Sequence, residues 1–309
     1  MNITAVVHYY LPTHRAGAEV MLHELLCPLA ARGHRVQVWA TDQDGPDTVV
    51  DGVHVHCGRP NTLDATVVVS HLKNVPLARD LARAARARFV QVLHSDAPWI
   101  AREVRRGADL FVANTHWVAD ALSLRARRLV VRPPVWPADH ATTPGDRVTL
   151  VNPLPEKGAG VFYELAARLP GVRFLAVEGG YQQPEQTRPS GQPNIAWQPH
   201  TTDMRRTVWS RTKVLLMPSS YESYGMCAVE AAASGIPTIA APTPGLREAL
   251  GDAGLWADPD DVDLWEKHLR DLLDGGWGAA SAAALARSRE LDSTGEVAEW
   301  VRTVETSLS

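Results

Sequence analysis

The sequence predicts an α/β protein with two Rossmann-like doubly wound domains in tandem. Short apolar runs alternate with helical patterns along most of the 309 residues. The strand-like runs are apolar along their whole length, which is typical of parallel strands covered by helices on both faces. Near the middle, the proline-rich segment RPPVWPADHATTPGD interrupts the alternation and indicates a connection between two domains.

The first half of the chain contains the elements of one such domain. ITAVVHY reads as a strand, and AEVMLHELLCPLAARG repeats apolar residues at helical spacing before it stops at Gly33. The next strand-like runs are VQVWA, ATVVVS, RFVQVLH, DLFVAN and RRLVV. Helical stretches such as KNVPLARDLARAAR lie between several of them. We therefore predict a Rossmann-like N-terminal domain over residues 1–136.

The second half repeats this pattern. RVTLV, RFLAV, NIAW, KVLLM, PTIA and GLWA read as strands, and helices are expected to begin near Gly158, Met204, Tyr224, Gly245 and Asp261. We expect a linker over residues 137–146 and a second Rossmann-like domain over residues 147–290. A C-terminal helix is expected over residues 291–309, and packing back on the first domain is one option for it. Ligands of such sheets bind beyond the carboxyl ends of the strands, so a cleft between the two domains is the expected site.

Composition excludes several classes of protein. The net charge of −4 gives no reason to expect nucleic acid as a partner. The three cysteines are odd in number and far apart, so they form neither a disulfide framework nor a metal site, and a reducing cytoplasm is expected. No apolar run reaches the ~18 residues of a membrane span. The N-terminus reads as a strand and not as a signal peptide.

Two carboxylates in the stretch YESYGMCAVEAAASGIP are candidate ligand-binding groups. Glu222 follows the strand-like run KVLLMPSS, and Glu230 lies inside MCAVEAAA, which reads as a buried helix. A buried carboxylate without partners costs several kcal/mol. One interpretation is that Glu230 reaches the surface or pairs with an arginine. The other is that it points into a cleft and accepts hydrogen bonds from a ligand.

Three glycine-containing loops lie where the strands of each sheet end. Gly17, in YYLPTHRAGAEV, and Gly158, in NPLPEKGAGVF, each precede a helix whose backbone N–H groups could meet a phosphate. Lys157 is one of only four lysines beside 27 arginines, which favours a specific use for its compact charge. A plain turn and a solvated lysine are the alternatives.

The third loop ends at Gly225, which lets the chain approach a ligand closely at a helix start. The amides of Met226 and Cys227 are among those that lack partners within the helix. A phosphate at this point would have Glu222 before it and Glu230 two turns beyond it. Both carboxylates are then placed to accept hydrogen bonds from sugar hydroxyls.

The two glutamates, spaced with seven residues between them in ESYGMCAVEAAASGIP, resemble the signature of retaining family-four glycosyltransferases with the GT-B fold. The resemblance extends along most of the chain through AGAEVMLHELLCPLAARGHRVQVWA, ADLFVANTHWVADAL, NPLPEKG, VEGG and TPGLREAL. It implies that Lys157 neutralises the diphosphate of a nucleotide sugar and that the amides around Gly225, Met226 and Cys227 hold its oxygens. It further implies that Glu222 binds the donor sugar and Glu230 the ribose.

The same resemblance assigns His94, at the end of RFVQVLH, to a position near the reacting sugar. A helix-capping or core histidine is the alternative. The chain departs from the family where Asn152 stands in place of the usual arginine, five positions before Lys157. Glycines are also missing at Ala16 and Pro244, where the family has pairs. Arg247 or another arginine is a candidate substitute for the lost charge.

The sequence thus predicts a metal-independent, retaining glycosyltransferase that needs no cofactor. Its substrates are a nucleotide diphosphate sugar and a small-molecule, glycan or lipid-linked acceptor. A nucleotide-sugar epimerase of the same architecture and a non-catalytic sugar-nucleotide-binding protein are the alternatives. The acceptor is expected against the first domain, where Tyr9, Tyr10, His94 and Trp99 lie near strand ends. Peripheral contact with an anionic membrane through Arg79, Arg83 and Arg86 is a further hypothesis, against an ordinary solvated helix.

Overall fold

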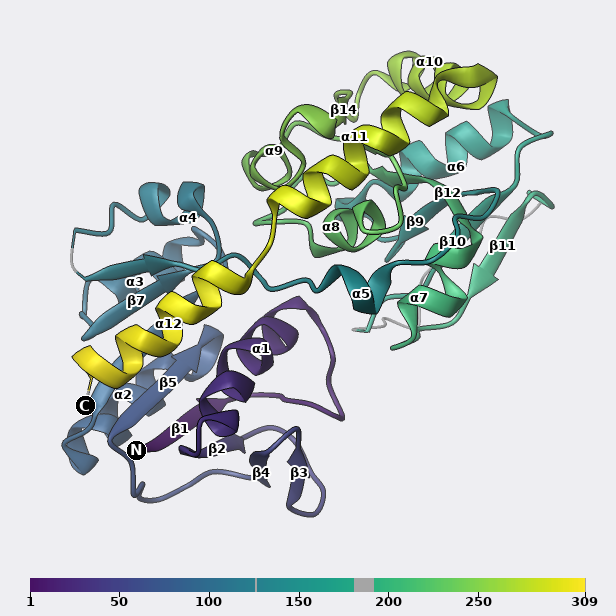
Figure 1. Cartoon of the computed structure of the whole chain (residues 1–309). Coiled ribbons are helices and arrows are strands. Elements are labelled where there is room, and N and C mark those ends of the chain that lie inside the picture. The colour runs from purple at the N-terminus through teal and green to yellow at the C-terminus, as the bar shows by residue number, and fades with distance from the viewer. Residues whose placement is uncertain (126, 181–191, 309) are drawn as a thin grey trace. The chain divides into compact units, whose positions relative to one another are not determined.

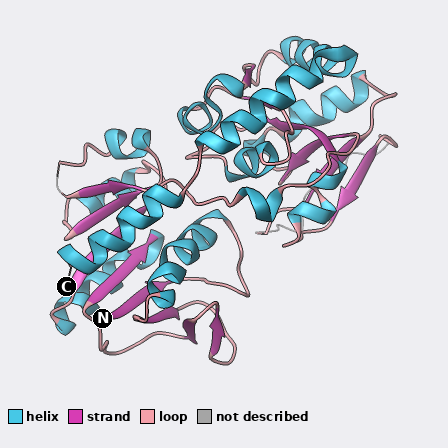
Figure 2. Ribbon diagram, in the orientation of Figure 1, coloured by secondary structure: helices cyan, strands magenta, loops and turns pink. Residues whose placement is uncertain are grey.

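The computed structural model describes residues 1–125, 127–180 and 192–308, and the chain divides into two compact units. Unit 1 comprises Met1–Pro134 together with Ser293–Ser309, and unit 2 comprises Val135–Asp292. In each unit a sheet is flanked by helices (Figures 1 and 2). Residues 137–146, expected as a linker, fall within unit 2 and include the short helix α5 (Pro137–His140).

Unit 1 contains an eight-stranded sheet in the order β3-β4-β2-β1-β5-β6-β7-β8. The strands are β1 (Asn2–Val7), β2 (Arg35–Ala40), β3 (Thr48–Val50), β4 (Val53–Cys57), β5 (Val67–His71), β6 (Arg88–Leu93), β7 (Leu110–Ala113) and β8 (Arg128–Val130). The helices are α1 (Gly17–Ala31), α2 (Val75–Ala85), α3 (Pro98–Val104), α4 (His116–Ala121) and α12 (Thr294–Ser307). The pairs are parallel except β3–β4.

The antiparallel hairpin of β3 and β4 was not predicted, although its signal is present in VVDGVHV. Asp51 and Gly52 form the two-residue turn, with φ of 47° and 82°. Asp-Gly suits a hairpin turn that needs positive φ at both central positions. The short strands, of three and five residues, extend the edge of an otherwise parallel sheet.

Side chains alternate between the two faces of this sheet and fill a core on each. Ile3, Ala5 and Val7 of β1 pack with α1 and α12, and Val6 packs with α2 on the opposite face. The last helix therefore completes the core of unit 1, where it lies along α1 (Figure 1). The indole nitrogen of Trp300 donates a hydrogen bond of 2.7 Å to the carbonyl of Leu25 in α1.

Helix α2 does not present the basic face that the sequence suggested. Arg79 is only 5% exposed, and its guanidinium donates a 2.6 Å hydrogen bond to Glu103. Of the three arginines considered for membrane contact, only Arg83 and Arg86 are exposed. The placement of Arg79 in that face was wrong because helical spacing alone did not reveal its buried partner. No helix in the described part of the chain is long and apolar enough to cross a membrane.

Unit 2 contains a six-stranded sheet in the order β11-β10-β9-β12-β13-β14, and its pairs are parallel. The strands are β9 (Arg147–Val151), β10 (Phe174–Val177), β11 (Ile195–Gln198), β12 (Thr212–Met217), β13 (Thr238–Ala240) and β14 (Leu255–Trp256). Besides α5, the helices are α6 (Ala159–Arg168), α7 (Met204–Thr207), α8 (Met226–Ala232), α9 (Pro244–Leu250), α10 (Val262–Asp271) and α11 (Trp277–Glu290). One face packs with α6 and α10 and the other with α8 and α9, so this unit is also doubly wound.

Candidate functional site

The strand order of unit 2 places a ligand site between β9 and β12. The chain proceeds from β9 to β10 and β11 on one side, and then returns to β12 on the other side of β9. In doubly wound sheets ligands bind beyond the carboxyl ends of the strands at such a reversal. The loops that leave β9 and β12 here are residues 152–158 and 218–225, which carry most of the residues that the sequence singled out.

Lys157 and Glu222 meet across this reversal. The ammonium of Lys157, after β9, donates a 2.6 Å hydrogen bond to Oε1 of Glu222, after β12. The hydroxyl of Ser219, a buried residue, donates to the same oxygen at 3.0 Å. The side chains of Lys157 and Glu222 are 29% and 14% exposed, so the pair is partly shielded from water. Two groups predicted to bind different parts of a ligand are thus each other's partners here.

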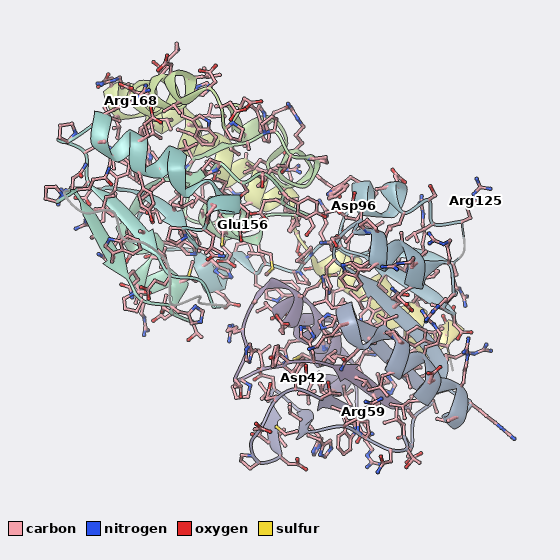
Figure 3. The ribbon with its side chains drawn as sticks, turned by 180° about the vertical axis from the view of Figure 1, so that it is seen from behind. Asp42, Arg59, Asp96, Arg125, Glu156 and Arg168 are labelled. Carbon is pink, nitrogen blue, oxygen red and sulfur yellow. The ribbon has the colours of Figure 1, made fainter. Side chains whose placement is uncertain are left out.

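Gly158 allows the two loops to approach this closely. Its φ is +78°, and a Cβ at this position would lie 2.4 Å from the carbonyl oxygen of Pro218. The backbone N–H of Ser220 donates to the carbonyl of Glu156 at 3.0 Å, which ties the loops together on the other side of the glycine. Figure 3 labels Glu156 in this loop. The position of Lys157 is therefore fixed by backbone contacts on both sides.

Helix α8 begins at the same edge. Its N-cap is Gly225, with φ of 102°, and a Cβ there would lie 2.5 Å from Leu246 of α9. The first helical residues are Met226 and Cys227, whose backbone N–H groups have no carbonyl partner earlier in the helix. Burial raises the pKa of the Cys227 thiol well above its usual range, and the nearby carboxylates of Glu230 and Glu222 add to this effect. The side chain of Cys227 is consequently a neutral thiol. The group that this residue offers to an anionic ligand is its backbone N–H.

The carboxylate of Glu230, which stands in an otherwise apolar helix, lies beside α5. Its side chain is 13% exposed, and Oε2 lies 3.8 Å from Nδ1 of His140 in α5. The segment that carries His140 is held at the turn that follows α8, because Ser234 donates to the His140 carbonyl at 3.0 Å and accepts from the Thr142 N–H at 3.0 Å. Glu230 therefore points toward α5 and is largely shielded from solvent.

Asn152 occupies a backbone position with special requirements. Its φ is +60°, a region that asparagine adopts more readily than most residues. A Cβ on Gly179, after β10, would lie 2.5 Å from Oδ1 of Asn152, so the two segments are in close contact. Oδ1 itself is buried and has no hydrogen-bond partner among the described residues. The amide that replaces the family's arginine is thus positioned by its backbone, with its oxygen against Gly179.

Arg247, a candidate substitute for that missing charge, is engaged elsewhere. Its guanidinium carbon lies 4.8 Å from the centre of the Trp256 ring. Its neighbour Gly245 does touch the site, because a Cβ there would lie 2.3 Å from the carbonyl oxygen of Glu222. The retained glycine of this segment therefore lets α9 pass close behind Glu222.

The two predicted site residues of unit 1 lie at the corresponding edge of its sheet. Gly17 is exposed at the first position of α1, after an extended Ala16 that makes no side-chain cap. Nε2 of His94, just after β6, lies 2.9 Å from Nδ1 of His71, the last residue of β5. Burial, followed by the charge of His8, lowers the pKa of His94 to about 4, so its ring is neutral at pH 7.

The aromatic residues expected near an acceptor do not form one group. Tyr10 is fully buried, and its hydroxyl lies 2.8 Å from Nδ1 of His23, so it belongs to the core. Tyr9 stacks on His14 with ring centres 4.0 Å apart. Trp99 is 39% exposed on α3. Of these, Tyr9 and Trp99 alone stay candidates for contact with a ligand.

Sequence reasoning missed several polar residues at both edges. In unit 2 these are Ser219 and His140, and in unit 1 they are His8, Glu19 and His71. His8 and His71 stand at or just past the end of a strand, which is the same signal that identified His94. Glu19 gave no signal, because a carboxylate in the first turn of a helix is normally explained by the helix dipole.

Comparison with known proteins agrees with this geometry. Residues 147–275 match the family model of group 1 glycosyl transferases. Over 263 residues the chain is 30% identical to D-inositol 3-phosphate glycosyltransferase of Mycolicibacterium vanbaalenii, a match that covers 69% of this chain and 57% of that protein. An 85-residue stretch is 36% identical to O-antigen chain mannosyltransferase B of Escherichia coli and covers 27% of this chain and 22% of that protein. The chain spans less than two thirds of the length of either relative.

Solved structures extend the likeness to the whole chain. HepE from Anabaena, in complex with UDP and glucose, has a TM-score of 0.80 at 17% identity, with 99% of this chain and all of that chain covered. Sucrose-phosphate synthase from Thermosynechococcus elongatus has a TM-score of 0.78 at 14% identity, with 100% and 99% covered. These matches confirm the predicted GT-B fold. The predicted resemblance to glycosyltransferases is confirmed over residues 147–275 by the family match.

Proposed function

We propose, from the group 1 glycosyl transferase domain of residues 147–275, that this protein is a retaining glycosyltransferase. It would move a sugar from a nucleotide diphosphate sugar to a hydroxyl group of an acceptor. The positive charge at the diphosphate would come from Lys157 and from backbone N–H groups, with no metal ion and no cofactor. The cytoplasmic location expected from the cysteines stays a prediction.

The observation that carries the proposal is the 2.6 Å contact between Lys157 and Glu222 across the β9–β12 reversal. A diphosphate bound at this edge offers Lys157 more negative charge than one carboxylate does. Glu222 is then released to accept hydrogen bonds from the hydroxyls of the donor sugar. Because each group keeps a charged or hydrogen-bonding partner in both states, neither is left buried and unpaired.

The remaining polar groups of unit 2 fit the other parts of such a donor. The amides of Met226 and Cys227, behind Gly225, suit diphosphate oxygens. Glu230, oriented toward α5 with His140 beside it, suits the two hydroxyls of the ribose. The Asn152 amide has an unused Oδ1 and adds a neutral hydrogen-bonding group where the family places a charge.

The proposed chemistry needs no nucleophile from the protein. The leaving phosphate would accept the proton of the attacking hydroxyl on the same face of the sugar, so the configuration at the anomeric carbon is retained. Electrostatic stabilisation of the leaving diphosphate by Lys157 and the helix N–H groups would be the main contribution of unit 2. The raised pKa of Cys227 is consistent with this role, because the thiol stays protonated among these groups.

The relatives support the classes of substrate without specifying them. HepE was solved with UDP and glucose, which supports a nucleotide sugar as donor. The name of the mycobacterial relative supports a small polar acceptor. We propose that unit 1 binds the acceptor, and that His94 at the end of β6 contacts the transferred sugar, as the family resemblance implies.

The test is calorimetry of Lys157→Ala with UDP and with uridine. A hydrogen bond to a charged group contributes about 1.5–3 kcal/mol, so the affinity for UDP should fall by about tenfold or more. The affinity for uridine should stay within about twofold, since it carries no phosphate. Lys267→Ala is the matched control, because that lysine is exposed on α10 with Asp271 as its partner.

Equal losses for UDP and uridine would contradict the assignment of the diphosphate to Lys157. The assignment would also be wrong if Lys157→Ala and Lys267→Ala bound UDP alike. Thermal unfolding of both variants checks that the loss is not a loss of folded protein.

A further inference from the structure

A second cluster of polar side chains lies at the carboxyl edge of unit 1, and its members have no assigned role in the proposed transfer, although His94 beside them does. Here too the strand order reverses, between β1 and β5. His8 follows β1, His71 is the last residue of β5, and Glu19 lies in the first turn of α1. One ligand atom from each of the three lies within 4.8 Å of the other two.

The cluster is unusually buried for a group of ionisable side chains. His71 and Glu19 are both 0% exposed, and His8 is half-buried. Among the described residues, Nε2 of His71 has no hydrogen-bond partner, and neither does Nδ1 of His8. Buried polar atoms are paired in the large majority of cases, so a ring nitrogen of a fully buried histidine that lacks a protein partner is a candidate ligand for an ion or a water.

The other ring nitrogen of His71 is already positioned as it is in metal sites. Nδ1 of His71 lies 2.9 Å from Nε2 of His94. If Nδ1–H donates this bond, Nε2 presents its lone pair to the cluster. Metal-binding histidines almost always donate their second N–H to a neighbouring acceptor, which fixes the tautomer and the ring orientation. His94 would be that acceptor.

We propose that His8, Glu19 and His71 form a binding site for a divalent first-row metal ion of the zinc type, with His94 as the residue that orients His71. Two imidazoles and one carboxylate are a ligand set that zinc uses when a fourth position is left for water or another oxygen ligand. Zinc–ligand bonds of about 2 Å put neighbouring ligand atoms roughly 3.3 Å apart.

The surroundings distinguish this cluster from a second one in unit 1. His23, Cys27 and Asp51 are also within ligating distance of one another. There, however, His23 is engaged on both sides, with the Tyr10 hydroxyl at 2.8 Å and Asp51 at 3.0 Å. The Asp51 side chain is 75% exposed. Because both ring nitrogens of His23 have partners, the second cluster is explained by its hydrogen bonds.

The experiment is zinc titration of the full chain after treatment with a chelator, with competition by a chromophoric chelator as readout. We expect one zinc ion per chain. His8→Ala and Glu19→Gln should each weaken binding, and His94→Gln should weaken it by about 10- to 100-fold, the usual cost of losing the group that orients a metal ligand. Two control variants, His23→Asn in the second cluster and His54→Ala at an exposed position of β4, should bind zinc as the wild type does.

Cobalt substitution gives a spectroscopic measurement that depends on the metal ligands themselves and not only on whether the protein is folded. Cobalt bound by the cluster should give a visible absorption spectrum that His8→Ala alters and His54→Ala leaves unchanged. His8 is the most exposed of the three ligands, so its variant is expected to fold, and circular dichroism checks this. Absence of stoichiometric zinc binding would overturn the proposal, and so would binding that is lost in His23→Asn and kept in His8→Ala.

Discussion

The two sheets carry opposite chemistry at equivalent places. Both units are doubly wound, and both bring loops together where the strand order reverses. In unit 2 this edge holds the charged groups Lys157, Glu222 and Glu230, with glycines where the loops touch. In unit 1 the edge holds the histidine cluster, which we define as His8, His71 and His94 with Glu19.

The difference shows how one topology serves two kinds of ligand. A fixed cation beside helix N–H groups that lack partners within the helix suits the diphosphate diester of a nucleotide sugar, whose charge does not vary near neutral pH. Neutral imidazoles suit a metal ion or an uncharged hydroxyl compound, for which lone pairs matter more than net charge. In both proposals the topology specifies where the ligand would lie, and the side chains at the strand ends specify its chemical class.

The largest expected effect comes from the glycine contact on which the edge of unit 2 depends. Gly158→Ala introduces a Cβ at φ +78°, 2.4 Å from Pro218. Left-handed backbone costs about 1–2 kcal/mol, and overpacking adds about 1–3 kcal/mol. We expect the free energy of unfolding to fall by about 4 kcal/mol. UDP binding should weaken as well, because the loop of Lys157 shifts.

Gly160→Ala is the matched control for this change. Gly160 lies two residues further on, inside α6, and nothing lies within 4 Å of a Cβ placed there. Because Gly160 is the second residue of α6, alanine there should be neutral or should stabilise by at most about 0.5–1 kcal/mol, the value for a helix interior. Urea unfolding of both variants makes the comparison. Similar effects of the two substitutions would mean that loop contact does not hold this edge together.

The next effect is a loss of about 3 kcal/mol in the free energy of unfolding at low pH. It tests whether the histidines at the edge of unit 1 are neutral. The pKa of His94 is lowered to about 4, chiefly by burial, against 6.5 for an unperturbed histidine. The pKa of His71 is also lowered by burial. Below pH 6.5 the unfolded chain binds more protons than the folded chain. Stability therefore falls as pH drops from about 6.5 to about 4, and His94 alone contributes ~1.4 kcal/mol to this loss for each pH unit.

His94→Gln should remove part of that pH dependence. The difference in unfolding free energy between wild type and variant, measured by urea titration, should decrease from pH 7 to pH 4.5. Carboxylates titrate in the same range, but their contribution cancels in the difference. His54→Gln, on the exposed side of β4, should give a difference that does not vary with pH. A constant difference for His94→Gln would show that this edge accommodates a charged ring.

Most of the fold, but not the pairing within the sites, could be predicted from the sequence. Apolar runs such as RVTLV and KVLLM identify strands directly, because burial on both faces leaves little room for polar residues. The order in which the strands lie side by side in the sheet has no comparable signal in the sequence. Lys157 and Glu222 are 65 residues apart, and their contact depends on β12 returning beside β9. The same holds for His8 and His71, which were not singled out although each follows or ends a strand.

Asn152 illustrates the other limit of sequence reasoning, because its significance lies in the backbone. The residue was noted for the arginine it replaces, whereas the structure shows a φ of +60°. Of the residues other than glycine, asparagine is among those that adopt this conformation most readily. No spacing or composition reveals a positive φ at a position without glycine.

The smallest expected effect tests whether a second fixed charge would strengthen the edge of unit 2. Asn152→Arg adds a cation where the family has one, and a charge-assisted hydrogen bond to phosphate is about twice as strong as a neutral one. Two features oppose a gain. Arginine at φ +60° costs about 1 kcal/mol, and Asn152 Oδ1 already lies within 2.5 Å of the place a Cβ on Gly179 would take. The longer arginine side chain must therefore point in a different direction from the Asn152 amide, which is already against Gly179.

We expect UDP binding by Asn152→Arg, measured by calorimetry, to stay level or fall, and the free energy of unfolding to drop by about 1 kcal/mol. Asn152→Gly separates the two contributions, since it removes the amide and accepts the positive φ without strain. If the backbone is the main constraint, the glycine variant should be at least as stable as the arginine variant. Tenfold tighter UDP binding by Asn152→Arg would show instead that the edge lacks positive charge. The enzyme would then hold its donor loosely, with Lys157 as the chief cation of the described residues at this edge.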